Sequence, residues 1–307
     1  MSESQIPAGV YSTLEQLIEL RYAARKLNLN QRRRALSLLA GSNRTTFRGR
    51  GIDFEEVRGY QPGDDIRTID WRVTARTGEA HTKLFREERE RPVLVVVDQR
   101  SPMFFGSRNC FKSVLAAELS ALLSWAALQR GDRVGGLIFG DEEHREVRPR
   151  RSRRSVLGLL SHLVEMNQAL GQSVEPGHVS FRDALLDLRR IARPGSALFL
   201  VSDFQGALDS DAVENLYQLA RHMEITALHC SDPLEGRLPR AGHYAVSDGL
   251  ARSELHTANK RLRAKFSEAH RQQLEATRET YGRLGIPLIE ISTADSPLSV
   301  LQAYYSE

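Results

Sequence analysis

The sequence predicts an α/β fold with a doubly wound, mostly parallel sheet of the Rossmann type. Short apolar runs at residues 92–98 and 197–201 are typical of strands that are buried on both faces of a parallel sheet. Segments with helical spacing of apolar residues lie between the expected strands. Strands that alternate with helices form a parallel sheet with helices on both faces.

The elements follow in order from residue 92. The expected strands of the sheet are 92–98, 133–139, 197–201, 225–230 and 286–291, with 144–148 and 243–247 as short edge strands. The expected helices are 110–130, 153–168, 180–193, 209–223 and 256–284, with a short last helix from Pro297. Gly131 is expected to end the first of these helices.

The residues before 92 have a different composition. Residues 1–41 are expected to form a helical segment, over about 12–40, with a break near Asn28. Residues 42–91 are rich in glycine, arginine and acids, which predicts a small, charged, β-rich subdomain with strands over 52–60 and 66–83. The α/β domain then covers residues 92–307.

Composition narrows the class of protein. The 307 residues carry a formal net charge of +4, and five of the 43 basic residues are lysines. No run approaches the roughly 18 apolar residues of a membrane-spanning helix, so we expect no membrane insertion. Two distant cysteines, Cys110 and Cys230, favour a reducing compartment, and we expect a cytoplasmic protein.

Two aspartates mark the most interesting positions. Asp98 and Asp203 each follow an apolar strand, and ligands of such sheets bind beyond the carboxyl ends of the strands. Two carboxylates with hydroxyls nearby suit a hard cation such as Mg²⁺, and the candidate hydroxyls are those of Ser101, Ser180 and Ser202. The alternative is that each aspartate caps the following helix or turn.

These motifs resemble a von Willebrand factor A-type domain. The resemblance rests on Asp98 with Met103, Phe105 and Gly106, on residues 131–135, and on Ser202-Asp203-Phe204. It implies a metal-ion-dependent adhesion site whose first motif is Asp-x-Ser-x-Ser, with a threonine and an aspartate from later loops.

This chain departs from that motif. Arg100 and Pro102 replace the two serines, Asp203 fits the later aspartate, and Ser180 is only near the threonine position. A guanidinium beside Asp98 can form a bidentate ion pair in place of a metal. We therefore expect a degenerate site, with weak or absent metal binding at Asp98 and Asp203. The expected binding rim comprises Asp98, Arg100, Ser101, Met103, Ser180 and Asp203.

The most specific stretch is the charged one at residues 49–72. Together with residues 74–76 and 87–90, it closely resembles the family called "domain of unknown function 58", over about residues 12–305. The resemblance implies a von Willebrand A-like domain after the signature, and a partnership with MoxR-type AAA+ ATPases in chaperone-like complex maturation.

The signature alternates in charge over a short span. Its members are Asp64, Asp65, Arg67, Asp70, Trp71 and Arg72. The charged groups favour an ion-pair network, and Trp71 is expected in the core of the small subdomain. The alternatives are a docking surface for a partner and, with less support, a catalytic role of the carboxylates.

A third constellation is the run of arginines at 145–154, which fits a solvated loop or a contact with phosphate or an acidic partner. Because no aromatic residues are interleaved with these arginines, we expect no binding of nucleic acid. The chain lacks a Gly-x-x-x-x-Gly-Lys-Ser/Thr loop and a Gly-x-Ser-x-Gly motif. The absence of these motifs favours a non-catalytic interaction protein, and the family resemblance implies that it is an adaptor for a MoxR-type ATPase and a protein client. The competing prediction is a metal-dependent hydrolase that uses Asp98 and Asp203.

Overall fold

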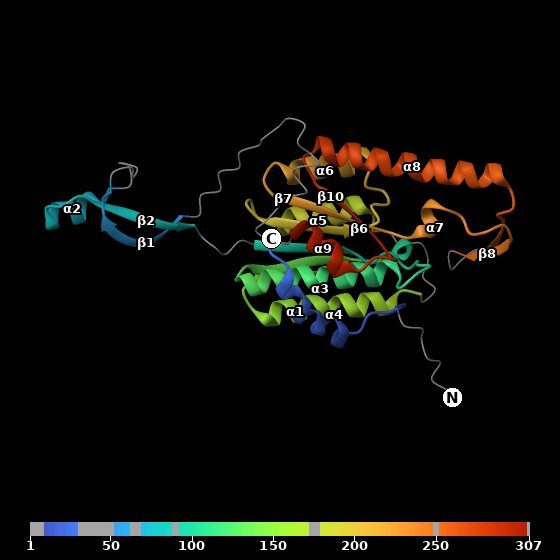
Figure 1. The fold of residues 1–307 in the computed structure, drawn as a ribbon, viewed down its shortest axis with the longest axis horizontal. Helices are drawn as coiled ribbons and strands as arrows, with labels where there is room; N and C mark the ends of the chain where they lie inside the picture. Colours follow the sequence, from blue (N-terminus) through green and yellow to red (C-terminus); the bar gives the residue numbers. More distant parts are fainter. Residues whose placement is uncertain are drawn as a thin grey trace. The chain divides into compact units, whose positions relative to one another are not determined.

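The computed structural model of the chain describes residues 9–29, 52–61, 69–87, 92–171, 179–247 and 252–305. The chain divides into two compact units, one formed by Met1–Asn43 with Pro92–Glu307 and the other by Arg44–Arg91. Their elements are drawn in Figure 1.

A six-stranded sheet forms the centre of the larger unit, in the order β10-β7-β6-β3-β4-β5. Its strands are β3 (Pro92–Asp98), β4 (Arg133–Phe139), β5 (His144–Arg150), β6 (Ala197–Ser202), β7 (Glu224–Ser231) and β10 (Leu288–Ser292). Every pairing is parallel except that of β5 with β4. The predicted mostly parallel sheet is therefore confirmed, as is the antiparallel edge strand at 144–148.

Helices cover both faces of this sheet, as Figure 1 shows. One hydrophobic core includes side chains of α1 (Leu14–Ala23), α3 (Lys112–Arg130), α4 (Arg153–Ala169) and α9 (Pro297–Tyr305). The core on the other face includes side chains of α5 (Phe181–Ile191), α6 (Ser210–Ala220) and α8 (Lys260–Arg283). The predicted α/β doubly wound fold is confirmed.

Strand β3 explains why its sequence is apolar throughout. Val93, Val95 and Val97 belong to the core with α3, whereas Leu94 and Val96 belong to the core with α5 and α6. Successive side chains of a strand point to opposite faces, and here both faces are covered. All five residues are buried.

Helix α3 is buried on nearly all sides. It ends at Gly131, as predicted, and this residue has a φ of 94°, a left-handed conformation that glycine adopts at low cost. On its outer side, the Trp125 indole Nε1 donates a hydrogen bond of 3.0 Å to the carbonyl oxygen of Leu17 in α1. The N-terminal helix thus belongs to the core of the larger unit.

The first part of the helix expected over 12–40 ends with a 3₁₀ turn at Lys26, close to the expected break near Asn28, and the residues from 30 onward lie outside the described part. Two other expectations about elements are corrected. Strand β8 (His243–Ser247) is no edge of the main sheet, because its partner is β9 (Arg252–His256) in a separate hairpin. That hairpin also delays the start of α8 to Lys260.

The smaller unit contains β1 (Ile52–Gly59), α2 (Trp71–Thr77) and β2 (His81–Glu87). Strands β1 and β2 are antiparallel. The strand expected over 66–83 is wrong, because α2 occupies its middle. The Asp70 side chain caps this helix by accepting from the backbone N–H groups of Arg72 and Val73, which favours a helix start.

No helix in the described ranges combines the length and apolarity needed to cross a membrane. Both cysteines are free thiols. Burial raises the pKa of Cys110 to about 12, and burial raises that of Cys230 well above its ordinary value.

Candidate functional site

The topology brings Asp98 and Asp203 to one crevice. Asp98 is the last residue of β3, and Asp203 directly follows β6, which pairs with β3. The chain leaves β3 for β4 on one side and returns to β6 on the other. This is the switch point at which parallel sheets bind ligands.

The Asp98 carboxylate is fully buried and accepts four hydrogen bonds. Oδ1 accepts from the backbone N–H of Arg100 at 3.0 Å and from its Nε at 3.0 Å. Oδ2 accepts from the Arg100 Nη2 at 2.7 Å and from the Ser202 hydroxyl at 2.6 Å. A carboxylate has about four lone-pair positions, so this one is saturated by its own neighbours.

The Arg100 guanidinium is fixed in turn by its surroundings. Its Nη2 donates to the carbonyl oxygen of Gln205 at 3.1 Å. Its carbon lies 5.3 Å from the ring centroid of Phe139 and 5.9 Å from that of Phe181, within the range of cation–π attraction. The bidentate pair expected from the sequence is thus present in a largely apolar setting. Burial raises the pKa of Asp98, although the charge and hydrogen bonds of Arg100 oppose the rise.

Lys112 is a residue of the crevice that sequence reasoning missed. It begins α3, its side chain is 2% exposed, and its ammonium lies 2.8 Å from Asp203 Oδ2 and also pairs with Glu235. One feature of the sequence could have revealed it: lysine is rare in this chain, and this lysine stands at the start of a mainly apolar helix. Burial alone lowers the pKa of Lys112, but the two carboxylates outweigh it and raise that pKa.

The influences on the pKa of Asp203 combine to the opposite result from those on the pKa of Asp98. Burial favours a higher pKa, but the charge and hydrogen bond of Lys112 outweigh it, so the pKa of Asp203 is lowered. The crevice therefore holds two internal cations, a guanidinium on Asp98 and an ammonium on Asp203. Within the described residues, no group of three or more His, Cys, Asp or Glu side chains is arranged to hold a metal ion.

The other expected rim residues lie in different settings. Ser101 donates to the Asp141 carboxylate through its backbone N–H and its hydroxyl. Ser180 caps α5 in a reciprocal pair with Asp183, so the hydroxyl on Asp98 is that of Ser202 instead. Met103 is fully buried in the core, which corrects its placement on an exposed rim.

A second residue that sequence reasoning missed, Asp232, fixes the loop that follows Ser101. Asp232 accepts from the backbone N–H of Ser107 at 2.7 Å, from its hydroxyl at 2.6 Å, and from the Thr293 hydroxyl. Burial favours a higher pKa, but these hydrogen bonds outweigh it and lower the pKa of Asp232. Phe105, in the same loop, is 40% exposed.

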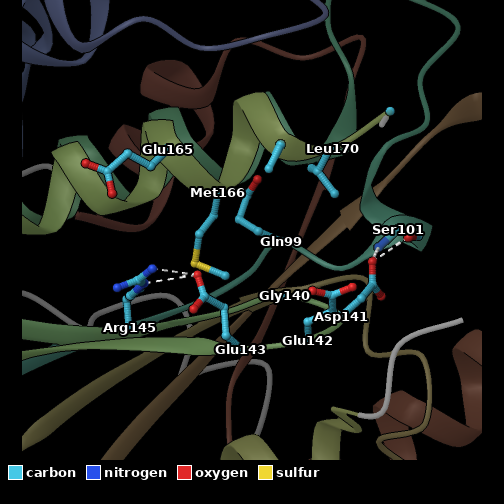
Figure 2. Close-up of a pocket in the computed structure, with 12 residues that line it drawn as sticks. Gln99, Ser101, Gly140, Asp141, Glu142, Glu143, Arg145, Glu165, Met166 and Leu170 are labelled. Atoms are coloured by element: carbon cyan, nitrogen blue, oxygen red, sulfur yellow. Dashed lines mark hydrogen bonds and ion pairs between the residues drawn. The ribbon is translucent and has the colours of Figure 1, made fainter. Parts of the chain in front are cut away.

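Two cavities flank the strand ends. The larger has a volume of about 420 Å³, and its lining includes Lys112, Asp203, His229, Glu235 and residues of α8. The smaller, about 210 Å³, lies beside Ser101 and has an apolar floor at Met166 and Leu170 with a rim of carboxylates. Figure 2 shows Arg145 paired with Glu143 at that rim.

Of the charged signature, Asp64, Asp65 and Arg67 lie outside the described residues. Asp70 caps α2 and Arg72 is exposed. Trp71 is 68% exposed, so its predicted place in the core of the small subdomain is wrong: as the first residue of α2, directly after the cap, its side chain is left in solvent.

Comparisons with known proteins agree with the sequence signature. The model of a family described as "Protein of unknown function DUF58" matches residues 56–276. The uncharacterized protein Mb1516 of Mycobacterium bovis is 30% identical over 303 residues, which cover 95% of this chain and 92% of that protein. The uncharacterized protein YeaD of Bacillus subtilis is 31% identical over 88 residues, 29% of this chain and 20% of YeaD.

Among solved structures, an aerotolerance-related membrane protein from Bacteroides fragilis is 16% identical, with a TM-score of 0.44, over 70% of this chain and 96% of that one. A von Willebrand factor type A protein from Catenulispora acidiphila is 11% identical, with a TM-score of 0.38, over 73% and 42%. Likenesses this distant carry no information about function.

Proposed function

We propose a non-catalytic, protein-interaction role for this chain, which belongs to the DUF58 family of proteins of unknown function. In this proposal it is an adaptor that works with a MoxR-type AAA+ ATPase, in chaperone-like maturation of a client protein. The observation that carries the proposal is the internal neutralisation of both strand-end aspartates by Arg100 and Lys112.

Catalysis by these carboxylates requires a group that is free to move a proton or hold a metal. All four acceptor positions of Asp98 are used, and Asp203 is held by a buried ammonium. A cation that entered the site would have to displace the guanidinium and leave it unpaired in an apolar pocket, which is costly. The arrangement therefore fits a rigid binding edge better than a reaction centre.

The exposed part of this edge is the loop after β3. Phe105 is an exposed aromatic side chain there, and aromatic anchors dominate many protein interfaces. The loop is fixed by Asp232 on one side and by Asp141 on the other. A preformed loop with an exposed aromatic side chain loses little conformational entropy on binding.

The test is association with the MoxR-type ATPase of the same organism, measured by co-purification with and without nucleotide. We expect the wild-type chain to bind and Phe105→Asp to abolish binding. Tyr217→Asp is the matched control, because Tyr217 is a similarly exposed aromatic residue, on α6. The absence of association in every nucleotide state would contradict the proposal.

The second candidate function is the metal-dependent hydrolase that uses Asp98 and Asp203. It is favoured by one observation, the cavity of about 420 Å³ that reaches Asp203. Calorimetric titration with Mg²⁺ and Mn²⁺ separates the two functions. Submillimolar binding that Asp98→Ala abolishes would establish the metal site and reject the adaptor proposal in its present form.

The proposal includes a cytoplasmic location. Two free cysteines, one of them wholly buried, fit a compartment that keeps thiols reduced.

A further inference from the structure

One end of the larger unit concentrates positive charge. Residues 237–266 contain seven lysines and arginines and two carboxylates, in a chain whose net charge is +4. Six of these cations are exposed. With two neighbouring apolar side chains they form what is called here the basic tip: Arg237, Arg240, Arg252, Lys260, Arg261, Lys265, Leu262 and Phe266.

Hydrogen bonds hold the parts of the basic tip together. The Thr257 hydroxyl donates to the carbonyl oxygen of Arg240 at 2.6 Å, and the backbone N–H of Thr257 donates to that of Gly242. The Arg263 side chain donates to the carbonyl oxygen of Thr257. Figure 1 shows β8 beside the start of α8 at this end of the unit. The loop, the hairpin and the helix start therefore form one surface.

Among the described residues, no carboxylate neutralises the six cations of the basic tip. Further along α8, Arg271 pairs with Glu268 and Glu275, and Arg278 pairs with Glu290. No such ion pair with a carboxylate joins any of the six cations to another described residue. Paired and unpaired cations thus occur within the same helix, so the high arginine content of the chain does not explain why those of the tip lack such pairs.

The placement of these cations also opposes helix stability. The first turn of α8 contains no acidic residue, although the positive end of the helix dipole favours carboxylates there. Arg261 and Lys265 are four residues apart, a spacing at which like charges repel. An anionic partner would relieve both effects.

An apolar stripe on α8 links the basic tip to the crevice. Leu262 and Phe266 are 38% and 37% exposed and share a face because they are one turn apart. On the same side of the helix, His270, Gln273 and Thr277 line the cavity that also contains Lys112 and Asp203. The exposed stripe is thus the outward continuation of the helix face that closes the cavity.

We propose that the basic tip binds an acidic segment of a partner protein, whose apolar side chains contact Leu262 and Phe266 and which runs along α8 toward the crevice. The inference rests on the proposed function only in assigning this segment to the partner ATPase. Cations beside two apolar anchors at helical spacing are suited to a short acidic motif.

A protein segment fits this surface better than a membrane or nucleic acid. Two exposed apolar residues offer less than the broad apolar face with which amphipathic helices enter a bilayer. A stripe that continues into a cavity suits a chain that can follow it. Binding of single-stranded nucleic acid relies on several stacking aromatic residues, whereas α8 exposes one, Phe266, at the tip.

The test uses a fluorescein-labelled peptide of glutamates and leucines, with a second peptide in which serines replace the leucines. We expect the intact chain to bind the first peptide with salt-sensitive affinity. Arg261→Gln/Lys265→Gln and, separately, Phe266→Ala should each weaken binding about tenfold. The leucine-free peptide should bind the wild type as weakly as the leucine peptide binds Phe266→Ala.

Arg25→Gln/Lys26→Gln is the matched control, because Arg25 and Lys26 are also an exposed arginine and lysine but lie after α1 and are followed by the buried Leu27. Its affinity should stay within about twofold of the wild type. If the control variant lost as much affinity for the peptide, net charge alone would explain the effect, and the inference would be overturned. Tighter binding to phosphatidylglycerol vesicles or to a DNA strand than to the peptide would also overturn it, in favour of those ligands.

The same variants separate this inference from the proposed function. An ATPase that binds the wild type and the Arg261→Gln/Lys265→Gln variant equally would overturn the basic tip as its docking surface and leave the adaptor role intact. Peptide binding at the tip without any ATPase association would support the surface and reject the proposed partner.

Discussion

Two ion pairs of the same geometry differ in burial. Arg100 and Asp98 form a bidentate pair with distances of 3.0 and 2.7 Å, and Arg278 and Glu290 form one with distances of 2.6 and 2.7 Å. The Asp98 side chain is inaccessible to solvent, whereas the side chains of Arg278 and Glu290 are 52% and 35% exposed. Solvent screening makes exposed pairs weak, and burial makes a broken pair expensive.

Arg100→Ala should lower the free energy of unfolding by about 3–5 kcal/mol, because it leaves a buried carboxylate without its counter-ion. Arg278→Ala should lower it by no more than about 1 kcal/mol. Urea unfolding of the three proteins at neutral pH gives both values. Similar losses in the two variants would show that the Asp98 site is open to solvent.

Contacts of single residues were predicted correctly where the type of residue left few possible partners. A guanidinium two residues after Asp98, in the place of a metal-binding serine, has few other partners, and the expected pair is present. Lys112 was missed because its partners, Asp203 and Glu235, are 91 and 123 residues away in sequence. Spacing along the chain contains no information about such contacts.

At the level of elements, α1 acts as the outer cover of α3. Leu17 is buried in the core, and its carbonyl oxygen accepts from Trp125. The apolar spacing predicted a helix at 110–130, and the structure shows that this helix, α3, is buried almost all round. The side of α3 that faces away from the sheet is covered by α1, from the N-terminal part of the chain. The sequence of α3 itself does not show that this helix covers it.

Leu17→Ala should therefore lower the free energy of unfolding by about 2–5 kcal/mol, the range for a large buried side chain that leaves a cavity. Tyr22→Ala, on the exposed side of the same helix, should change it by no more than about 0.5 kcal/mol. Thermal and urea unfolding measure both. An equally small effect of Leu17→Ala would mean that α1 is not part of the cooperative unit.

Prediction of elements succeeded where burial in the sheet leaves a recognisable pattern in the local sequence. Strands β3 and β4 have the predicted bounds, because continuous burial leaves a continuous apolar signature. Helix α2 was read as strand, since alternating polar and apolar residues over a few positions fit either structure. The cap at Asp70 decides for the helix.

For the whole molecule, buried titratable groups set the pH dependence of stability. Burial lowers the pKa of His229 below 6.5, so the folded state stays neutral where the unfolded chain takes up a proton. Stability is then complete above pH 6.5 and falls as the pH decreases toward the folded pKa. Asp203 and Asp232, with lowered pKa values, lose their contributions only at more acidic pH, and Asp98, with a raised pKa, acts in the opposite sense.

The free energy of unfolding should fall as the pH decreases below about 6.5, with a slope of at most about 1.4 kcal/mol per pH unit for one proton. His229→Gln, which cannot titrate, should flatten this part of the curve. Urea unfolding at several pH values measures the slope. An unchanged slope in the variant would assign the pH dependence to another group.

The two thiols have a practical consequence. With the pKa of Cys110 raised to about 12 and that of Cys230 raised well above 9.0, almost no thiolate exists in the folded protein at neutral pH, and thiolate is the species that reacts with alkylating reagents. Unfolding restores ordinary acidity to both sulfurs. Cys230 is wholly buried, so the rate at which its thiol is labelled in native solution measures how often the core opens, and no foreign probe has to be built into the chain.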